Sequence, residues 1–359
     1  MDFALFNPPY NLPSRSPREV FDWAVRLGVF ADSVGFTEYW VGEHATLGWE
    51  AIPSPELVLS ALVRETETMR LCAGAHLLPY HHPATLAAQT AWMSHLTEGR
   101  YILGVGAGAY PRDAALRGFK DLSQSHAMFL EAFDIMEKVW SGEVFEHEGR
   151  YWNAGWPEDD GGYDPQRRST PYGGTMRVGM AAISPNSPTM RFAGSRGMLP
   201  LSVFAGYDRV ANHWDTYEAS ARENGITPNR QDFHVTGDVF CADTDREAKR
   251  RAIEGGIGRA WSEYLLPQYQ KLGLLRPLIP DPDVDPMSVD IDYLAEHVWI
   301  VGSPETVVEK LQTAMDRVGG WGTTLVIAHD FMDDPGPWEQ SLSLLGTEVA
   351  PKLSATVGA

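Results

Sequence analysis

Short apolar segments alternate with amphipathic ones along the chain, and the first 110 residues show this alternation three times. The opening run 1–6 is typical of a strand. After it, Ser16, Pro17 and Glu19 have the order of a helix N-terminus, with a capping serine, a proline in the first turn and a glutamate three residues after the cap. Apolar residues then recur at helical spacing and predict one buried helix face: Val20, Ala24, Leu27, Phe30, Ala31 and Val34.

The same alternation continues to the C-terminus and predicts eight strands. They are expected at 1–6, 37–41, 70–75, 101–105, 176–180, 200–204, 233–241 and 323–328. Helices are expected near 16–34, 54–67, 83–96 and 337–349. The early strands follow one another at the spacing of right-handed βαβ units. Eight such units favour an α/β fold of the closed (β/α)₈ type, a TIM barrel, over an open doubly wound sheet.

Two intervals between predicted strands are too long for a single helix. Residues 141–175 are rich in Gly, Pro, Trp and acidic residues, and we expect an ordered excursion over the barrel that helps to line the substrate pocket. Residues 255–300 include the Pro- and Asp-rich run 277–286 and are expected to form a lid, the alternative being an extra helix on the outside. The inner face of this lid would be apolar: Trp261, Tyr264, Leu265 and Leu266. Although the length also allows two smaller domains, we predict one domain over 1–359, a barrel with insertions near 141–175 and 255–300.

The charge balance limits the partners of the protein. Its 29 Lys and Arg stand against 48 Asp and Glu, so the formal net charge of −19 disfavours nucleic acid and anionic membranes. No apolar stretch approaches the roughly 18–20 residues of a membrane span, and the N-terminus lacks a basic and apolar leader. The two cysteines, Cys72 and Cys241, are too few for a disulfide framework and fall in predicted strands as small buried hydrophobes. We expect a soluble, cytoplasmic protein.

Candidate chemistry is sought at the C-terminal ends of the strands, where TIM barrels build their active sites. The second predicted strand leads into Glu43 and His44. Because an imidazole exchanges protons near neutral pH, His44 is the best acid/base candidate. The alternative is a hydrogen-bonded structural histidine beside a solvated glutamate.

Two further strand ends could hold a cofactor. The glycine-rich run 104–108 is not a full dinucleotide fingerprint, so it either packs tightly or, lacking Cβ atoms, lets a flat ring approach. The segment 184–187 has the pattern of a helix start, which is either an ordinary N-cap or a phosphate site. Pro185 and Pro188 remove two N–H donors, so in a phosphate site the side chains of Ser184, Asn186 and Ser187 would have to compensate.

Three histidines, His76, His81 and His82, suggest a metal site. No carboxylate or second histidine lies at the ligand spacing of a helix. We therefore predict no metal.

In their order and spacing, several segments resemble the bacterial-luciferase-like flavin-dependent monooxygenases, from the first strand to the last helix. They are WVGEH at 40–44, MRLCAGAHLLP at 69–79 with His82-Pro83, GRYILGVGAG at 99–108, the Ser184-Pro185 turn, VGSPETV at 301–307 and VAP at 349–351. The resemblance implies a two-component monooxygenase that binds reduced FMN, adds dioxygen to it and protects the flavin hydroperoxide from water. A separate flavin reductase would supply the reduced FMN, the substrate would be an apolar organic molecule, and a homodimer is expected.

The resemblance also assigns roles by position. His44 looks like the family's acid/base histidine, with Glu43 beside the flavin. Gly74 and Ala75 match a pair joined by a cis peptide under the flavin ring. Gly106 and Ala107 match the wall near the reactive flavin carbon, and Tyr110, just after them, is a further expected cofactor contact. Ser184 and Ser187 match the phosphate contacts.

The sequence departs from luciferase itself at four positions in or next to these segments. Gly106 replaces a reactive cysteine, Ala107 an arginine on the phosphate, Ile183 a glutamate, and Ala45 a second histidine. These differences argue against light emission from a long-chain aldehyde. The lost arginine predicts weaker or differently arranged FMN binding.

Two rival functions share this fold. A deazaflavin-dependent dehydrogenase transfers hydride without oxygen, and several such enzymes carry a glutamate just after the glycine run, where this chain has GAYP at 108–111. A non-catalytic flavin-binding protein is the other rival, and retention of Glu43 and His44 argues against it. Terpenes, aromatics, alkanes and polyketides all remain open as substrates.

Overall fold

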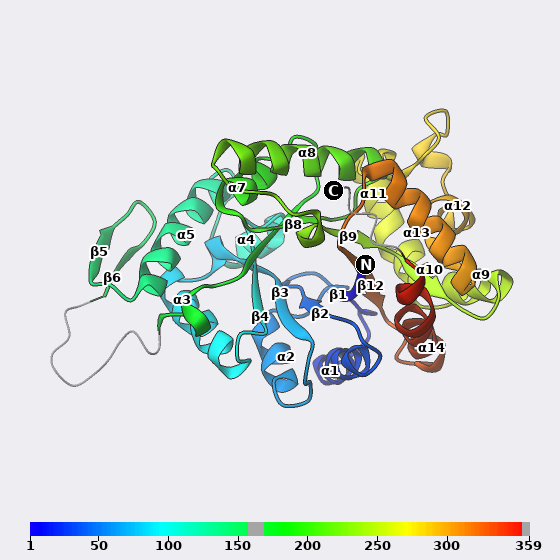
Figure 1. The fold of residues 1–359 in the computed structure, drawn as a ribbon, viewed down its shortest axis with the longest axis horizontal. Helices are drawn as coiled ribbons and strands as arrows, with labels where there is room; N and C mark the ends of the chain where they lie inside the picture. The colour runs from blue at the N-terminus through cyan, green and yellow to red at the C-terminus, as the bar shows by residue number, and fades with distance from the viewer. Residues whose placement is uncertain (157–168, 354–359) are drawn as a thin grey trace.

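Eight parallel strands close into a barrel with helices around it, in a computed structural model that describes residues 1–156 and 169–353 (Figure 1). Around the barrel the strand order is β1-β12-β9-β8-β7-β4-β3-β2. This confirms the predicted TIM barrel. The strands are β1 (Asp2–Tyr10), β2 (Glu38–Val41), β3 (Arg70–Leu77), β4 (Tyr101–Gly106), β7 (Val178–Ala182), β8 (Leu199–Ser202), β9 (His234–Gly237) and β12 (Thr323–His329).

The helices begin where the sequence supplies capping residues. Ser16 caps the first helix and forms the predicted capping box with Glu19. Among the described residues the α-helices are α1 (Pro17–Ser33), α2 (Pro55–Leu62), α3 (Pro83–Leu96), α4 (Pro111–Leu116), α5 (Ser125–Ser141), α7 (Pro188–Arg196), α8 (Tyr207–Glu223), α9 (Asp245–Glu254), α10 (Gly256–Ala260), α11 (Leu266–Leu272), α12 (Ile291–His297), α13 (Pro304–Val318) and α14 (Gly336–Leu344). None of them is long and apolar enough to cross a membrane.

The barrel interior is filled with side chains. One buried cluster takes its members from almost every barrel strand: Ala4, Trp40, Cys72, Ile102, Leu199, Leu201, Val203 and Leu325. Below it, the buried carboxylate of Glu38 accepts hydrogen bonds from Trp40 (2.7 Å) and Arg70 (3.1 Å), and its Oε2 lies 2.9 Å from Nε2 of His234. The barrel is therefore a packed core, and its chemistry has to lie at the mouth where the strands end.

The predicted strand 233–241 is wrong as a single element. Strand β9 ends at Gly237, and β10 (Val239–Cys241) leaves the barrel to pair with β11 (Ile300–Gly302). The break falls at Asp238, whose backbone carbonyl accepts from Ile300 and whose carboxylate turns toward the mouth. Because both halves are buried, the apolar pattern runs on through the break.

The described part of the 141–175 segment does not cover the barrel, contrary to expectation. Strands β5 (Phe145–Glu148) and β6 (Asn153–Trp156) form an antiparallel hairpin that projects beyond α5 at the left of Figure 1. The carboxylate of Glu131 on α5 holds it by accepting the backbone N–H groups of Tyr151 and Trp152. Residues 157–168, which complete the predicted excursion, lie outside the described part of the chain.

The 255–300 insertion is more helical than the predicted pliable loop. It contains α10, a π-helical turn η4 (Trp261–Leu265), α11 and α12, and only the stretch between α11 and α12 is mainly irregular. Two short 3₁₀ turns, η5 (Arg276–Leu278) and η6 (Pro286–Ser288), interrupt that stretch. The side chains predicted to form its inner face are all buried: Trp261, Tyr264, Leu265 and Leu266.

Candidate active site

His44 lies at the mouth of the barrel between two buried carboxylates. Its Nδ1 is 3.1 Å from Oδ2 of Asp113, and its Nε2 is 3.2 Å from Oε2 of Glu50. The segment after β2 carries His44 and Glu50, and the first turn of α4 carries Asp113. A hydrogen bond from the N–H of His44 to the carbonyl of Ile52 fixes the loop that positions the ring. With a carboxylate at each ring nitrogen, a protonated His44 would have both N–H groups matched.

The charges around His44 favour its protonated form. Burial lowers the pKa of His44, but the hydrogen bond to Asp113 and the charge of Glu50 raise it more, so it lies above the ordinary value. Burial also opposes ionisation of Asp113, yet hydrogen bonds from His44, Thr46 and the N–H of Ala45 bring the pKa of Asp113 down to about 2. Burial raises the pKa of Glu50 above its ordinary value. Asp113 is therefore the fixed negative charge, while the His44–Glu50 pair can exchange a proton.

The insertion closes over this cluster through Tyr264. The phenol of Tyr264 donates to Glu50 at 2.5 Å, and its ring stacks on Trp49 at 5.6 Å between centroids. Tyr10, at the end of β1, lies edge-on to Tyr264 at 6.1 Å. Tyr110 packs edge-on against the His44 ring at 5.0 Å. An aromatic wall thus limits water around the acid/base cluster.

Strands β3 and β4 end in a patch of backbone with almost no side chains. The Gly74–Ala75 peptide bond is cis, which confirms the predicted geometry, and the β3–β4 register shifts between Ala73 and His76. Gly74, Ala75, Gly106 and Ala107 are only half-buried, and Ala107 packs against the core. A Cβ on Gly106 would come within 3.3 Å of Leu77. Because these residues carry no side chain larger than a methyl group, a planar ring could approach their backbone closely.

Glu43 points into the protein. It is 2% exposed and accepts the N–H of Leu77 at 3.1 Å, and both its oxygens lie 2.9 Å from Nε2 of His81. Burial opposes its ionisation, but the nearby imidazoles of His76 and His81 bring the pKa of Glu43 down to about 2. The carboxylate therefore ties the end of β2 to the segment that carries Gly74 and Ala75.

The Ser184–Ser187 segment forms a turn held from α8. Ser187 is the N-cap of α7 and accepts the N–H of Thr189, which agrees with the N-cap alternative. Nε2 of His213 lies 2.8 Å from the Ser184 carbonyl oxygen, and Arg209 donates to the carbonyl of Ile183 at 3.0 Å. The Ser184 side chain is exposed. Arg209 thus brings a guanidinium to this turn. Position 107, where the family resemblance would place an arginine, is an alanine.

Sequence reasoning missed a third group of side chains at the mouth. Nε2 of His329, the last residue of β12, lies 2.6 Å from Oδ1 of Asp238, and Trp261 donates to Oδ2 of the same carboxylate at 2.9 Å. The sequence places His329 at the end of the eighth predicted strand but gives it no role. Asp238 was hidden in the middle of a predicted strand.

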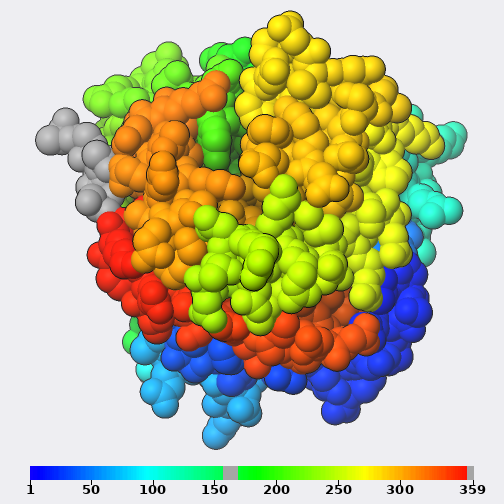
Figure 2. All heavy atoms as spheres, turned by 90° about the vertical axis from the view of Figure 1, so that its right-hand side faces the viewer, coloured from blue at the N-terminus to red at the C-terminus, as the bar shows by residue number. Residues whose placement is uncertain are grey.

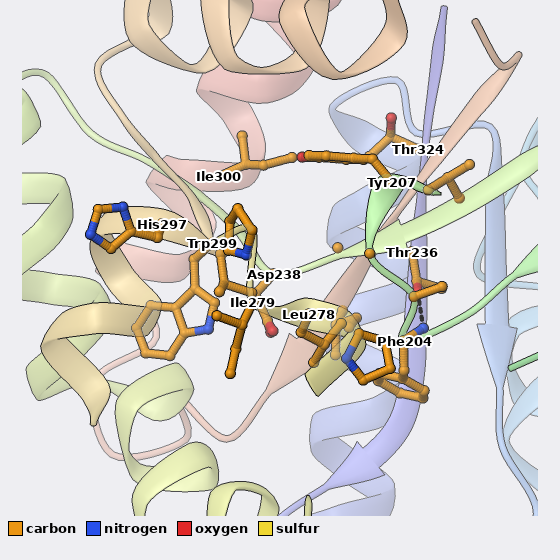
Figure 3. Close-up of a pocket in the computed structure, with 18 of the residues that line it drawn as sticks. Phe204, Tyr207, Thr236, Asp238, Leu278, Ile279, His297, Trp299, Ile300 and Thr324 are labelled. Atoms are coloured by element: carbon orange, nitrogen blue, oxygen red, sulfur yellow. Dashed lines mark hydrogen bonds between the residues drawn. The ribbon is translucent and has the colours of Figure 1, made fainter. Parts of the chain in front are cut away.

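A cavity of about 130 Å³ lies between the barrel, the insertion and α13. On the face drawn in Figure 2, the yellow insertion and the orange helix α13 lie on either side of a hollow. Phe204, Leu278, Ile279 and Trp299 line the cavity with apolar surface around the carboxylate of Asp238 (Figure 3). His44, Glu50 and Asp113 do not line it, so it is separate from the acid/base cluster.

Comparison with known proteins decides the family. The family model of the luciferase-like monooxygenases matches residues 1–320 of the chain. The chain belongs to this family. As a luciferase-like monooxygenase it is an oxidoreductase built on the barrel described above.

The relatives cover the whole barrel and not only a motif. The chain is 43% identical to 2,5-diketocamphane 1,2-monooxygenase 1 of Pseudomonas putida, over 98% of its own length and 99% of the relative's. It is equally similar to 3,6-diketocamphane 1,6-monooxygenase of the same organism, over 98% of each chain. The solved structure of the oxygenating constituent of 3,6-diketocamphane monooxygenase, a type II Baeyer-Villiger monooxygenase in complex with FMN, superposes with a TM-score of 0.95 at 43% identity and 99% coverage of both chains.

Proposed function

We propose that this luciferase-like monooxygenase is the oxygenating component of a two-component system that converts an apolar cyclic ketone into a lactone. It would take reduced FMN from a separate flavin reductase and consume one dioxygen per turnover. Ketone, dioxygen and reduced FMN would give lactone, water and oxidised FMN, so the two electrons and two protons of the flavin balance the second oxygen atom. The observation that carries the proposal is the open backbone patch at Gly74–Ala75 and Gly106–Ala107 beside a titratable His44, in a chain that aligns end to end with diketocamphane monooxygenases.

The patch and the α7 turn are the proposed FMN site. The half-exposed backbone of Gly74, Ala75, Gly106 and Ala107 would seat the flavin ring, and Tyr110 would border it. Ser184 and Ser187 would meet the phosphate, with Arg209 supplying the positive charge that position 107 lacks. An arginine–phosphate pair is a strong, charge-assisted contact. When bound, reduced FMN supplies the electrons that activate dioxygen.

His44 is proposed to hold a proton at Nε2, where Oε2 of Glu50 lies 3.2 Å away, and to deliver it when the substrate oxygen takes the place of that carboxylate. As oxygen adds to a ketone, negative charge builds on the carbonyl oxygen, and a protonated imidazole within hydrogen-bond distance stabilises that charge. Asp113 keeps the ring oriented through Nδ1, and Glu50 can take up or return the proton on the other side. The raised pKa of His44, caused by the hydrogen bond to Asp113 and the charge of Glu50, favours the imidazolium form.

Exclusion of water is the proposed role of the insertion. Trp49, Tyr10 and Tyr264 cover the cluster, and the hydrogen bond from Tyr264 to Glu50 fastens the insertion onto it. A closed, apolar site strengthens the electrostatic contacts inside and suppresses loss of oxygen equivalents as hydrogen peroxide. The same apolar walls suit a hydrocarbon-rich ketone.

A reconstituted assay tests the proposal. Purified protein is combined with FMN, NADH, an unrelated flavin reductase and a bicyclic terpene ketone, and products are identified by mass spectrometry. We expect lactone only when the reductase is present, and no oxidation of NADH by the protein alone. Lactone without the reductase, or no oxygenated product from any of a panel of cyclic ketones, would overturn it.

A further inference from the structure

Glu43, His76 and His81 converge beside the barrel mouth although the sequence predicts no metal site. One ligand atom from each lies within 4.8 Å of the other two. Glu43 follows β2, His76 belongs to β3, and His81 follows the 3₁₀ turn η1 (Leu78–Tyr80). Helical spacing gives no hint of this group because its carboxylate comes from the neighbouring strand.

The imidazole of His76 lacks hydrogen-bond partners where it faces Glu43. The residue is 1% exposed, and its Nδ1 has no partner although Oε2 of Glu43 is only 3.6 Å away. On the other side of the ring, Nε2 lies 3.9 Å from Oε2 of Glu56, which is also buried without a partner. Buried polar atoms are normally hydrogen-bonded, and leaving one unpaired is costly. Two such atoms around one buried imidazole point to a missing ligand.

We propose that Glu43, His76 and His81 bind a divalent transition-metal ion of the zinc class. Two imidazoles and a carboxylate are the donors that such ions accept in three-ligand sites with an open position. Metal–ligand bonds of about 2.0–2.2 Å place tetrahedral donors roughly 3.4 Å apart. Oε2 of Glu43 lies 2.9 Å from Nε2 of His81 and 3.6 Å from Nδ1 of His76, on either side of this value. The ligand atoms of the two histidines lie within 4.8 Å of one another, so shifts of the side chains complete the site.

The second unpaired atom supports the same ion. A metal on Nδ1 of His76 leaves the ring proton on Nε2, where it faces the carboxylate of Glu56. This is the carboxylate–histidine–metal arrangement in which an outer carboxylate orients the ligating ring. One ion on Nδ1 of His76 therefore supplies the partner that this atom lacks and directs the Nε2 proton toward Glu56.

Arg117 is a positively charged side chain beside Glu43, so it would repel a metal ion bound there. Its Nη2 lies 3.5 Å from Oε1 of Glu43, a long contact. The guanidinium also donates to the carbonyl of Asp113 at 3.0 Å and lies over the Tyr80 ring at 4.4 Å. These two contacts hold Arg117 in place without Glu43, so the carboxylate of Glu43 can bind a metal ion instead. The bound ion would fix the turn between β3 and α3, next to Gly74 and Ala75.

Metal titration of the full chain tests the site. After treatment with a chelator, the protein is titrated with Zn²⁺ by calorimetry and with Co²⁺ by visible absorption. We expect one equivalent of each, with Co²⁺ bands of a low-symmetry nitrogen–oxygen site. His81→Ala, at a partly exposed position, should weaken Zn²⁺ at least about 100-fold, and Glu56→Gln by about 10–100-fold.

His82→Ala is the matched control, since this neighbouring histidine is exposed and lies outside the cluster. Its Zn²⁺ affinity should equal that of the unmodified protein. Absence of a stoichiometric equivalent, or equal Zn²⁺ affinity in His81→Ala and His82→Ala, would overturn the proposal. Because these readouts need no flavin or substrate, they are independent of the proposed monooxygenase function.

Discussion

At the scale of single residues, the acid/base cluster combines one position that the sequence predicted with two that it did not. His44 stands at a strand end, and strand ends can be found from hydrophobic periodicity alone. Asp113 lies 69 residues away and meets His44 only because the loops after β2 and β4 reach the same mouth. Glu50 is near in sequence, but a polar residue between strands gives no sign that it will be buried.

Replacement of His44 tests its proposed role in proton transfer. We expect His44→Ala to lower turnover with ketone by roughly 10²–10⁴-fold, the range typical of a lost general acid or base. FMN affinity and circular dichroism should stay close to those of the unmodified protein, because the ring is held by polar contacts at the surface of the core. Steady-state kinetics on folded His44→Ala would contradict the role if turnover were nearly unchanged.

The charge of Asp113 should set the pH range of activity. Its hydrogen bond raises the pKa of His44, and loss of its charge in Asp113→Asn lowers that pKa. If the imidazolium is the active form, activity is present below the pKa of His44 and is lost as the pH rises through it. The pH–activity profile of Asp113→Asn should therefore fall at lower pH, whereas the exposed Asp121→Asn should leave it in place. An unshifted profile in Asp113→Asn would show that another group titrates.

Arg209 should discriminate FMN from flavins without phosphate. Arg209→Ala is expected to weaken FMN binding about tenfold, the value of one charge-assisted contact near the surface, and to leave riboflavin binding unchanged. Fluorescence titration with both flavins measures this difference. Arg222→Ala, near the C-terminal end of the same helix, is the control. Equal losses for FMN and riboflavin would place Arg209 away from the phosphate.

At the scale of elements, hydrophobic periodicity located all eight barrel strands and the first three helices, but not where the chain leaves the barrel. The α3 prediction of 83–96 matches the observed Pro83–Leu96. The apolar pattern predicts one strand over 233–241 because β9 and β10 are both buried, and only the pairing of β10 with β11 separates them. The Pro- and Asp-rich run 277–286 predicts a loop, and the sequence gives no clear sign of the helices α11 and α12 on either side of it.

The insertion is predicted to protect the site through the Tyr264–Glu50 hydrogen bond. Tyr264→Phe removes one hydrogen bond from the buried Glu50 carboxylate, which costs about 1 kcal/mol and favours opening. We expect a several-fold higher ratio of hydrogen peroxide to lactone, with FMN affinity little changed. Tyr293→Phe, on α12 of the same insertion, should keep the original ratio. A peroxide assay that finds equal ratios in both variants would make the insertion a scaffold only.

At the scale of the whole molecule, the strand ends of the barrel collect groups from many parts of the chain. Eight alternating units favour a closed barrel over an open sheet, and closure itself is seen in the strand order of the structure. The sequence also located the Gly74–Ala75 and Gly106–Ala107 patch through its family resemblance. Asp238, Arg209 and the Glu43–His76–His81 group emerge only when the barrel brings their strands and loops together.

A single-turnover experiment with isotopic oxygen tests the central claim most directly. Chemically reduced FMN is mixed with the protein and a bicyclic ketone without air, and ¹⁸O₂ is then added. The account predicts one lactone per flavin at most, carrying one ¹⁸O atom, with His44→Ala giving mainly peroxide or no product. Lactone without ¹⁸O would contradict the account. Oxidation or reduction of the substrate without uptake of oxygen would also contradict it and would favour a hydride-transfer enzyme on the same fold.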